Sequence, residues 1–144
     1  MAYVDMAHAH VQRLLREGME LDELEQDGDG DYAFRHGTAA YFLSVHPDGH
    51  AVRIWSHAVQ GTKATAPVLR EVNDTNRRLV QSRAYVDGHT LVVECIVPVE
   101  PLTMAHLMGA CHEVACTADR LGSLVAAVHG GQVWFDQEVE EATG

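Results

Sequence analysis

Histidine is the residue type that could do the most chemistry in this chain, since ten of its 144 residues are histidines. Imidazole binds transition metals and exchanges protons near neutral pH. A structural zinc site needs four ligands at local spacings such as Cys-x2–4-Cys or His-x3–5-His. The His8–His10 pair and the His106–His112 pair have other spacings. We therefore expect scattered surface histidines, with no metal and no cofactor.

The cysteines Cys95, Cys111 and Cys116 show no Cys-x-x-Cys spacing. Free cysteine is among the most buried residue types, and reduced cysteines are typical of cytosolic proteins. The sequence contains no Gly-x-Ser-x-Gly motif, no recognisable Cys–His signature and no glycine-rich phosphate loop. These observations predict buried thiols, and they give no indication of an enzyme.

The run DGDGD at 27–31 resembles the opening of a calcium-binding loop. An EF-hand needs glycine at its sixth position and glutamate at its twelfth. Counting from Asp27, these positions hold Tyr32 and Thr38. The run therefore predicts a solvated turn.

The formal net charge is −11, with ten Lys and Arg residues in total. Nucleic-acid binding neutralises phosphates with such residues, so we expect no nucleic-acid partner. No apolar run approaches the roughly 18 residues that span a membrane, and the N-terminal sequence lacks the pattern of a secretory signal. We expect a cytoplasmic protein without membrane contact.

The apolar pattern predicts helices over 4–17, 67–81 and 104–129. The middle helix would be capped by Thr65 and would turn Val68, Leu69, Val72, Leu79 and Val80 toward the core. The last helix, capped by Thr103, has apolar residues at alternating spacings of four and three from Leu107 to Val128. Glycines at 130 and 131 would end it.

Alternating residues predict strands over 32–36, 38–45 and 51–59, followed by a hairpin around Asp87-Gly88. The order is α-βββ-α-ββ-α. This order fits a single α+β domain over residues 1–131, with an antiparallel sheet whose helices pack mainly on one face. An acidic tail would follow over 132–144.

The strand over 51–59 places Arg53, Trp55, His57 and Val59 on one face, opposite Val52 and Ile54. A tryptophan beside an arginine is typical of protein interfaces, so these four residues are candidates for partner binding. The alternative is that Trp55 packs under a helix.

Asn73 and Asn76 lie on one face of the predicted middle helix and are further candidates. They would bond either a partner's backbone or local backbone groups.

Between residues 51 and 130, four segments carry a family resemblance: VRIWSHAV, VLREVNDTNRRL, SRAYVDGHTLVVECIVPV and LTMAHLMGACHEVACTADRLGSLV. Their order resembles the bacterial YbjN-domain family within the type III secretion chaperone-like fold. The resemblance implies a curved antiparallel sheet backed by helices, often in a homodimer. Secretion chaperones of this fold hold an extended segment of a partner protein, and YbjN-like proteins are linked to regulation. No secretion context is visible in the chain, so that role is not carried over.

We expect a non-enzymatic, homodimeric protein-binding module with a chaperone-like or regulatory role. One alternative is a small-molecule or metal-binding sensor that uses the histidines and Trp55 in a cleft. Another is an accessory structural subunit without a ligand of its own.

Overall fold

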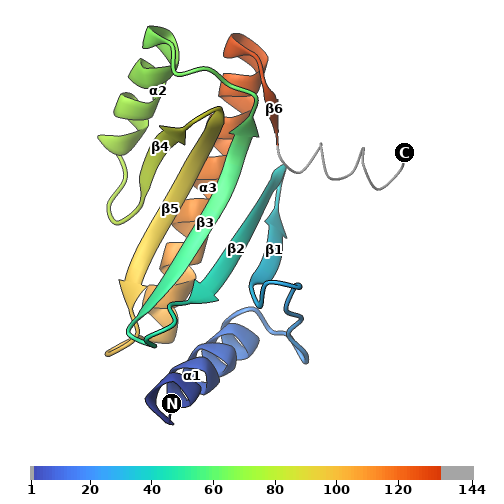
Figure 1. The fold of residues 1–144 in the computed structure, drawn as a ribbon, viewed down its shortest axis with the longest axis vertical. Coiled ribbons are helices and arrows are strands. Elements are labelled where there is room, and N and C mark those ends of the chain that lie inside the picture. Colours follow the sequence, from blue (N-terminus) through green and yellow to red (C-terminus); the bar gives the residue numbers. More distant parts are fainter. Residues whose placement is uncertain (1, 134–144) are drawn as a thin grey trace.

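The computed structural model describes residues 2–133 and confirms the predicted order of helices and strands (Figure 1). The elements are α1 (Ala2–Gly18), β1 (Tyr32–His36), β2 (Ala39–Val45), β3 (Ala51–Gln60), α2 (Ala66–Asn76), β4 (Arg83–Asp87), β5 (Thr90–Pro98), α3 (Met104–His129) and β6 (Gln132–Val133). The sheet pairing of β6 extends into the segment expected as a tail, and the rest of that segment lies outside the described residues.

The sheet has the strand order β1-β2-β3-β5-β4, and each described pair of neighbours is antiparallel. The short strand β6 pairs with the end of β3. Two hairpins are closed by glycine turns, in which Gly37 has a φ of 59° and Gly88 a φ of 61°. Such positive φ values are accessible to glycine without steric cost.

Helix α3 crosses one face of the sheet and covers its central strands (Figure 1). The hydroxyl of Thr103 accepts a hydrogen bond from His106 N at 3.2 Å, as the predicted cap requires. The apolar seam is buried from Leu107 to Val125, whereas Val128 is 64% exposed. The helix lies very close to β3 at Gly122, where a Cβ atom would come within 2.7 Å of the Ala58 carbonyl oxygen.

Helix α2 is shorter than predicted. It starts at the expected Thr65 cap and buries Val68 and Val72, but it ends at Asn76. Leu69 is 46% exposed and Val80 is 90% exposed, so the prediction that both face the core is wrong.

The connector after α2 explains the early end. Its backbone N–H groups at Gln81 and Ser82 donate to Glu113 of α3 at 3.1 and 2.7 Å. These bonds hold residues 81–82 against α3 and away from the helix axis of α2. Leu79 and Val80 continue the apolar spacing of the helix in the sequence, but the helix has already ended at Asn76.

Helix α1 packs against α3 and β2. Val11 and Leu15 are fully buried on its inner side. No helix within residues 2–133 combines the length and the apolar character that a membrane span requires.

Candidate peptide-binding surface

The sheet face opposite α3 is built from the outward residues of the strands. The pairing places Phe42 opposite Trp55, Trp55 opposite Glu94, and Glu94 opposite Arg83. Side chains of directly opposed residues lie close together on one face of a sheet. A continuous row of side chains therefore crosses four strands.

Trp55 is buried by neighbours on this face and is not part of the core under the helices. Its ring stacks on Phe42 with centroids 5.7 Å apart, and the guanidinium carbon of Arg53 lies 4.5 Å from the ring centroid. Only 9% of Trp55 is exposed. The expected Arg–Trp pair is present, but neighbouring side chains of the same chain already bury the tryptophan.

His57 lies two residues beyond Trp55, opposite Val92. Burial, followed by the nearby positive charge of Arg53, lowers the pKa of His57. The imidazole is therefore favoured in its neutral form next to the Arg–Trp pair.

Val59 does not share this face, contrary to the prediction. The register between β3 and β5 shifts between His57 and Val59, so that Val59 pairs with Leu91. Both residues are fully buried in the core. An extra residue in one strand reverses the alternation beyond it, which is why a strict period of two fails here.

Glu94 is the centre of the open face, although it was not among the predicted site residues. Its carboxylate accepts from Arg53 Nε at 2.6 Å and from Arg83 Nε at 2.7 Å, and the Arg83 terminal nitrogen makes a further close contact. The Tyr85 hydroxyl donates to it at 3.2 Å. Glu94 is only 3% exposed, so two arginines and a tyrosine enclose it.

The net electrostatic effect on Glu94 is stabilisation of its charged form. Burial alone would raise the pKa of Glu94, but the hydrogen bonds and charges of Arg83 and Arg53 outweigh burial and lower it. Hydrogen bonds of this kind, between ionised partners, are stronger than neutral ones. The open face is thus a preorganised polar and aromatic surface. The signal in the sequence was the hairpin register, since a turn at Gly88-His89 pairs Arg83 with Glu94.

Asn76 closes part of the sheet edge at β4. Its side-chain amide donates to the Ala84 carbonyl at 2.9 Å, and its amide oxygen accepts from Ala84 N at 2.8 Å. These are two of the backbone groups through which a further strand would pair with β4. Asn76 therefore takes the local alternative considered above, whereas the side chain of Asn73 is exposed.

The opposite edge of the sheet, β1, is less covered. Within residues 2–133, the outer side of β1 is paired only by an isolated bridge between Gln26 and Tyr32. A strand edge with unpaired backbone groups is a template for another extended segment. Of the two edges, β1 is the more open to strand addition.

An apolar hollow of about 300 Å³ lies between α1 and the connector from β5 to α3. It is lined by Tyr3, Met6, Ala7, His10, Val99, Glu100, Pro101 and Leu102. Met6 is 71% exposed and Tyr3 is 38% exposed. The rim is fixed by two polar contacts, one from the Tyr3 hydroxyl to Glu100 and one between the His10 ring and the Leu102 carbonyl.

Hollows of this size that are apolar inside and polar at the rim are typical binding sites. Sequence reasoning missed this one because its two walls are almost a hundred residues apart in the chain.

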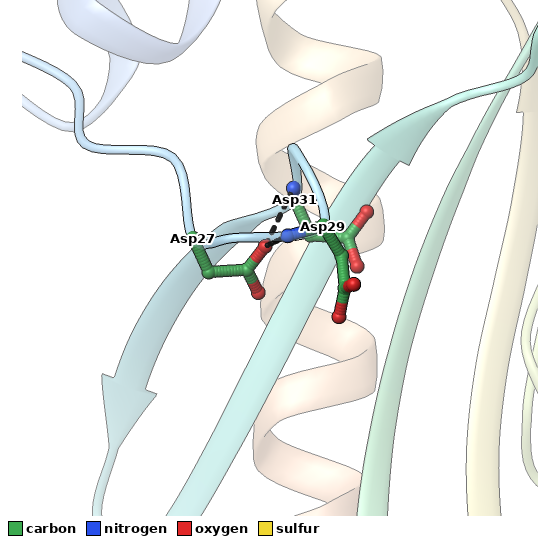
Figure 2. A group of neighbouring side chains, drawn as sticks. All are labelled: Asp27, Asp29 and Asp31. Carbon is green, nitrogen blue, oxygen red and sulfur yellow. Dashed lines mark hydrogen bonds between the residues drawn. The ribbon is translucent and has the colours of Figure 1, made fainter.

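The acidic run at 27–31 forms a tight turn (Figure 2). Asp27 accepts hydrogen bonds from the backbone N–H of Asp29 at 2.9 Å and of Asp31 at 3.0 Å. The three carboxylates lie within 4.8 Å of one another. Burial, then the neighbouring charges of Asp27 and Asp29, raise the pKa of Asp31. The predicted turn is present, and the hydrogen bonds to Asp27 explain why the three carboxylates lie close together.

Comparison with known proteins gives the fold a family. No curated protein matches by sequence. Among solved structures, a chain of the HopA1–SchA chaperone–effector complex matches with a TM-score of 0.62 and 14% identity, covering 82% of this chain and 97% of that one.

Two further structures show the same fold. Yersinia pestis SycH, solved with a fragment of YscM2, matches with a TM-score of 0.60 and 12% identity, covering 80% of this chain and 98% of that one. YbjN from E. coli matches with a TM-score of 0.60 and 12% identity, covering 81% and 89%.

The family profile described as "T3SS (YopN, CesT) and YbjN peptide-binding chaperone 1" matches residues 5–137, which is nearly the whole chain. The resemblance inferred from the sequence is thereby confirmed. The chain belongs to this family of peptide-binding chaperones related to YbjN and to type III secretion chaperones.

Proposed function

We propose that this protein is a non-enzymatic chaperone-like module that binds an extended segment of another protein, with the hollow beside α1 as the seat for one of its apolar side chains. The observation that carries the proposal is the exposed Met6 and Tyr3 over an apolar hollow of about 300 Å³. A peptide that covers these side chains removes apolar area from water, which contributes about 25 cal/mol per Å².

The open sheet face provides a second contact surface in this proposal. Arg53 and His57 lie half-buried on either side of the covered Trp55 ring, and neighbouring Ile96 is 55% exposed. Rigid side chains lose little entropy when a partner binds.

The test is selection of peptides from a random display library on the immobilised full chain, followed by affinity measurements on the enriched peptides. The variant is Met6→Asp, because a charge in the hollow opposes an apolar side chain. The matched control is Val128→Asp, on an apolar residue of α3 that is 64% exposed, against 71% for Met6. We expect Met6→Asp to weaken binding at least about tenfold, equivalent to about 1.4 kcal/mol, and Val128→Asp to leave it unchanged.

Two results would refute the hollow as the seat: equal affinities for wild type and Met6→Asp, or an equal loss in both variants. If no peptide is enriched above an unrelated acidic protein of the same size, the peptide-binding role itself is wrong for this chain. Arg53→Ala and Trp55→Ala then test the open face with any peptide that is found.

We also propose a homodimer. The apolar seam of α3 is buried in the chain's own core, and Asn76 caps β4 at Ala84. The exposed apolar residues near these elements include Leu69 and Val80 on the α2 side, and Val80 is the most exposed of them at 90%. Sedimentation equilibrium tests this proposal: wild type should dimerise, and Val80→Asp should shift the mass toward the monomer. A monomeric wild type at high concentration would exclude the dimer.

A cytoplasmic location is proposed on the chemistry of the cysteines. All three are free thiols, and two of them are buried. Unpaired cysteines are favoured in reducing compartments. Fractionation of the native cell, with detection of the untagged protein, tests the location, and recovery from an extracytoplasmic fraction would contradict it.

A further inference from the structure

The hollow beside α1 carries a carboxylate at one end. Among the described residues that line it, Glu100 has the one carboxyl group. The residue is exposed, and its Oε2 atom accepts a hydrogen bond from the Tyr3 hydroxyl at 3.2 Å. A carboxylate has sites for about four hydrogen bonds, so a single donor leaves room for a further, charged one.

A second carboxylate lies near the same end, in the turn between β2 and β3. This turn packs on the first turn of α1: the ring centroids of Tyr3 and His50 are 4.8 Å apart, and a Cβ atom at Gly49 would come within 3.1 Å of the α1 backbone. Asp48 of this turn has a side chain that is 54% exposed. Burial, the hydrogen bond to Glu100, and then the negative charges of Glu100 and Asp48 raise the pKa of Tyr3. Both carboxylates therefore act on the Tyr3 end of the hollow.

The opposite end of the hollow, at His10, lies about two helical turns from Tyr3 along α1. His10 Nε2 is 2.8 Å from the Leu102 carbonyl oxygen, and His10 Nδ1 is 3.3 Å from a terminal nitrogen of Arg13. A carbonyl only accepts and a guanidinium only donates, so Nε2 donates and Nδ1 accepts. Both ring nitrogens are thus occupied, and the guanidinium beside them disfavours a second cation at this end.

Between the two ends the lining is apolar and adaptable. Met6 is 71% exposed over buried Ala7 and Leu102. Methionine is flexible and polarisable, so it fits apolar side chains of different shapes. The apolar part of the hollow therefore selects weakly among apolar residues, and the charges at its rim are the features that discriminate between segments.

We propose that the hollow selects a basic partner segment, in which one apolar side chain fills the hollow and a Lys or Arg two positions away pairs with Glu100. In an extended chain, residues two positions apart point to the same side and lie about 7 Å apart, so both side chains reach this surface together. A cation is attracted at the Glu100 end, whereas at the His10 end it meets Arg13. The segment therefore lies with its basic residue toward Glu100. This inference rests on the proposed peptide binding.

The experiment sequences the peptides that the full chain enriches from a random display library and then measures affinities by fluorescence anisotropy. We expect the enriched peptides to carry Lys or Arg two positions from an apolar residue. One such peptide, and a copy with glutamine in place of its basic residue, are titrated against wild type, Glu100→Gln and Glu17→Gln. Glu100→Gln should weaken the basic peptide about three- to fivefold, the range of an exposed ion pair, and should leave the glutamine copy unchanged.

Glu17→Gln is the matched control, because it removes the same charge from an exposed glutamate at the other end of α1. It should bind both peptides like wild type. In Glu100→Gln the Tyr3 hydroxyl can still donate to the amide oxygen, so the rim keeps its shape. Asp48 is left unchanged because it also accepts from His50 N at 2.8 Å, a bond that holds the turn.

Enriched peptides without a preference for Lys or Arg would overturn the basic partner and leave peptide binding in place. Equal affinities of wild type and Glu100→Gln for the basic peptide would do the same. An equal loss in Glu100→Gln and Glu17→Gln would also overturn the pairing, because the net charge of −11 would then explain the attraction. No enriched peptide at all would refute the peptide-binding role, and this inference with it. Higher salt should weaken the basic peptide more than its glutamine copy, since salt screens exposed charges.

Discussion

Replacement of Glu94 by glutamine removes the carboxylate that holds Arg53 and Arg83 on the open sheet face. If all three groups were buried, each charge-assisted bond would contribute about 1.5–3 kcal/mol. The side chains of Arg53 and Arg83 are 39% and 65% exposed, so solvent screens both bonds. Exposed pairs contribute about 0.2–1 kcal/mol. Taking about 1.5 for Arg53 and about 0.5 for Arg83, we expect Glu94→Gln to lower the free energy of unfolding by about 2 kcal/mol.

The stabilisation that Glu94 provides depends on pH, and the shift of its pKa sets the direction of this dependence. The folded-state pKa of Glu94 lies below its ordinary value of 4.5. Its contribution is therefore fully present above pH 4.5 and is lost as the pH falls through the folded-state pKa. The difference between wild type and Glu94→Gln should be about 2 kcal/mol at pH 7 and should shrink steadily in acid.

Urea unfolding followed by circular dichroism measures the difference, with Glu17→Gln on α1 as the matched control for an exposed glutamate. At about 2–4 °C per kcal/mol, the melting temperature should fall by about 6 °C. A loss below about 0.5 kcal/mol at pH 7 would show that the cluster behaves as an exposed ion pair. A difference that does not change with pH would show that the charge of Glu94 is irrelevant.

Three further predictions concern an edge, a helix and a thiol. Asn76→Ala leaves two backbone groups of β4 unpaired, so urea unfolding should show a loss of about 1–2 kcal/mol and gel filtration should show self-association; an unchanged protein would contradict the cap. Gly122→Ala should destabilise by about 2 kcal/mol through a clash with Ala58, whereas Gly109→Ala, which meets only open space, should stabilise by up to about 1 kcal/mol; the opposite order in thermal melts would contradict the packing. Ellman's reagent should label Cys116 in the folded protein and the two buried cysteines only after unfolding, and more than one fast thiol would contradict their burial.

The sequence was most informative where one physical rule governed a whole element. The caps at Thr65 and Thr103 and the glycine turns predicted the starts of α2 and α3 and the hairpins. The order of elements followed from these signals. The end of α2 could not be predicted, because it depends on bonds from the connector to α3, far along the chain.

Only the part of the candidate site that lies along a single strand could be predicted from the sequence. Alternation along β3 placed Arg53, Trp55 and His57 on one face, but a bulge that no residue type announces moved Val59 into the core. Glu94 required the register of a second strand. The hollow beside α1 needs a tertiary contact that brings distant segments together. Local patterns carry no information about such contacts.

The amide of Asn76 also limits how many copies of this chain can join through their sheets. A polymer built by edge-to-edge pairing needs two available edges on every subunit, one to receive and one to extend. Because the Ala84 backbone groups are already occupied, the outer side of β4 is less open to a further strand than that of β1 among the described residues. Pairing through β1 alone would join two members, whether the second is another copy or a foreign segment. One side chain thus disfavours open-ended growth through both sheet edges.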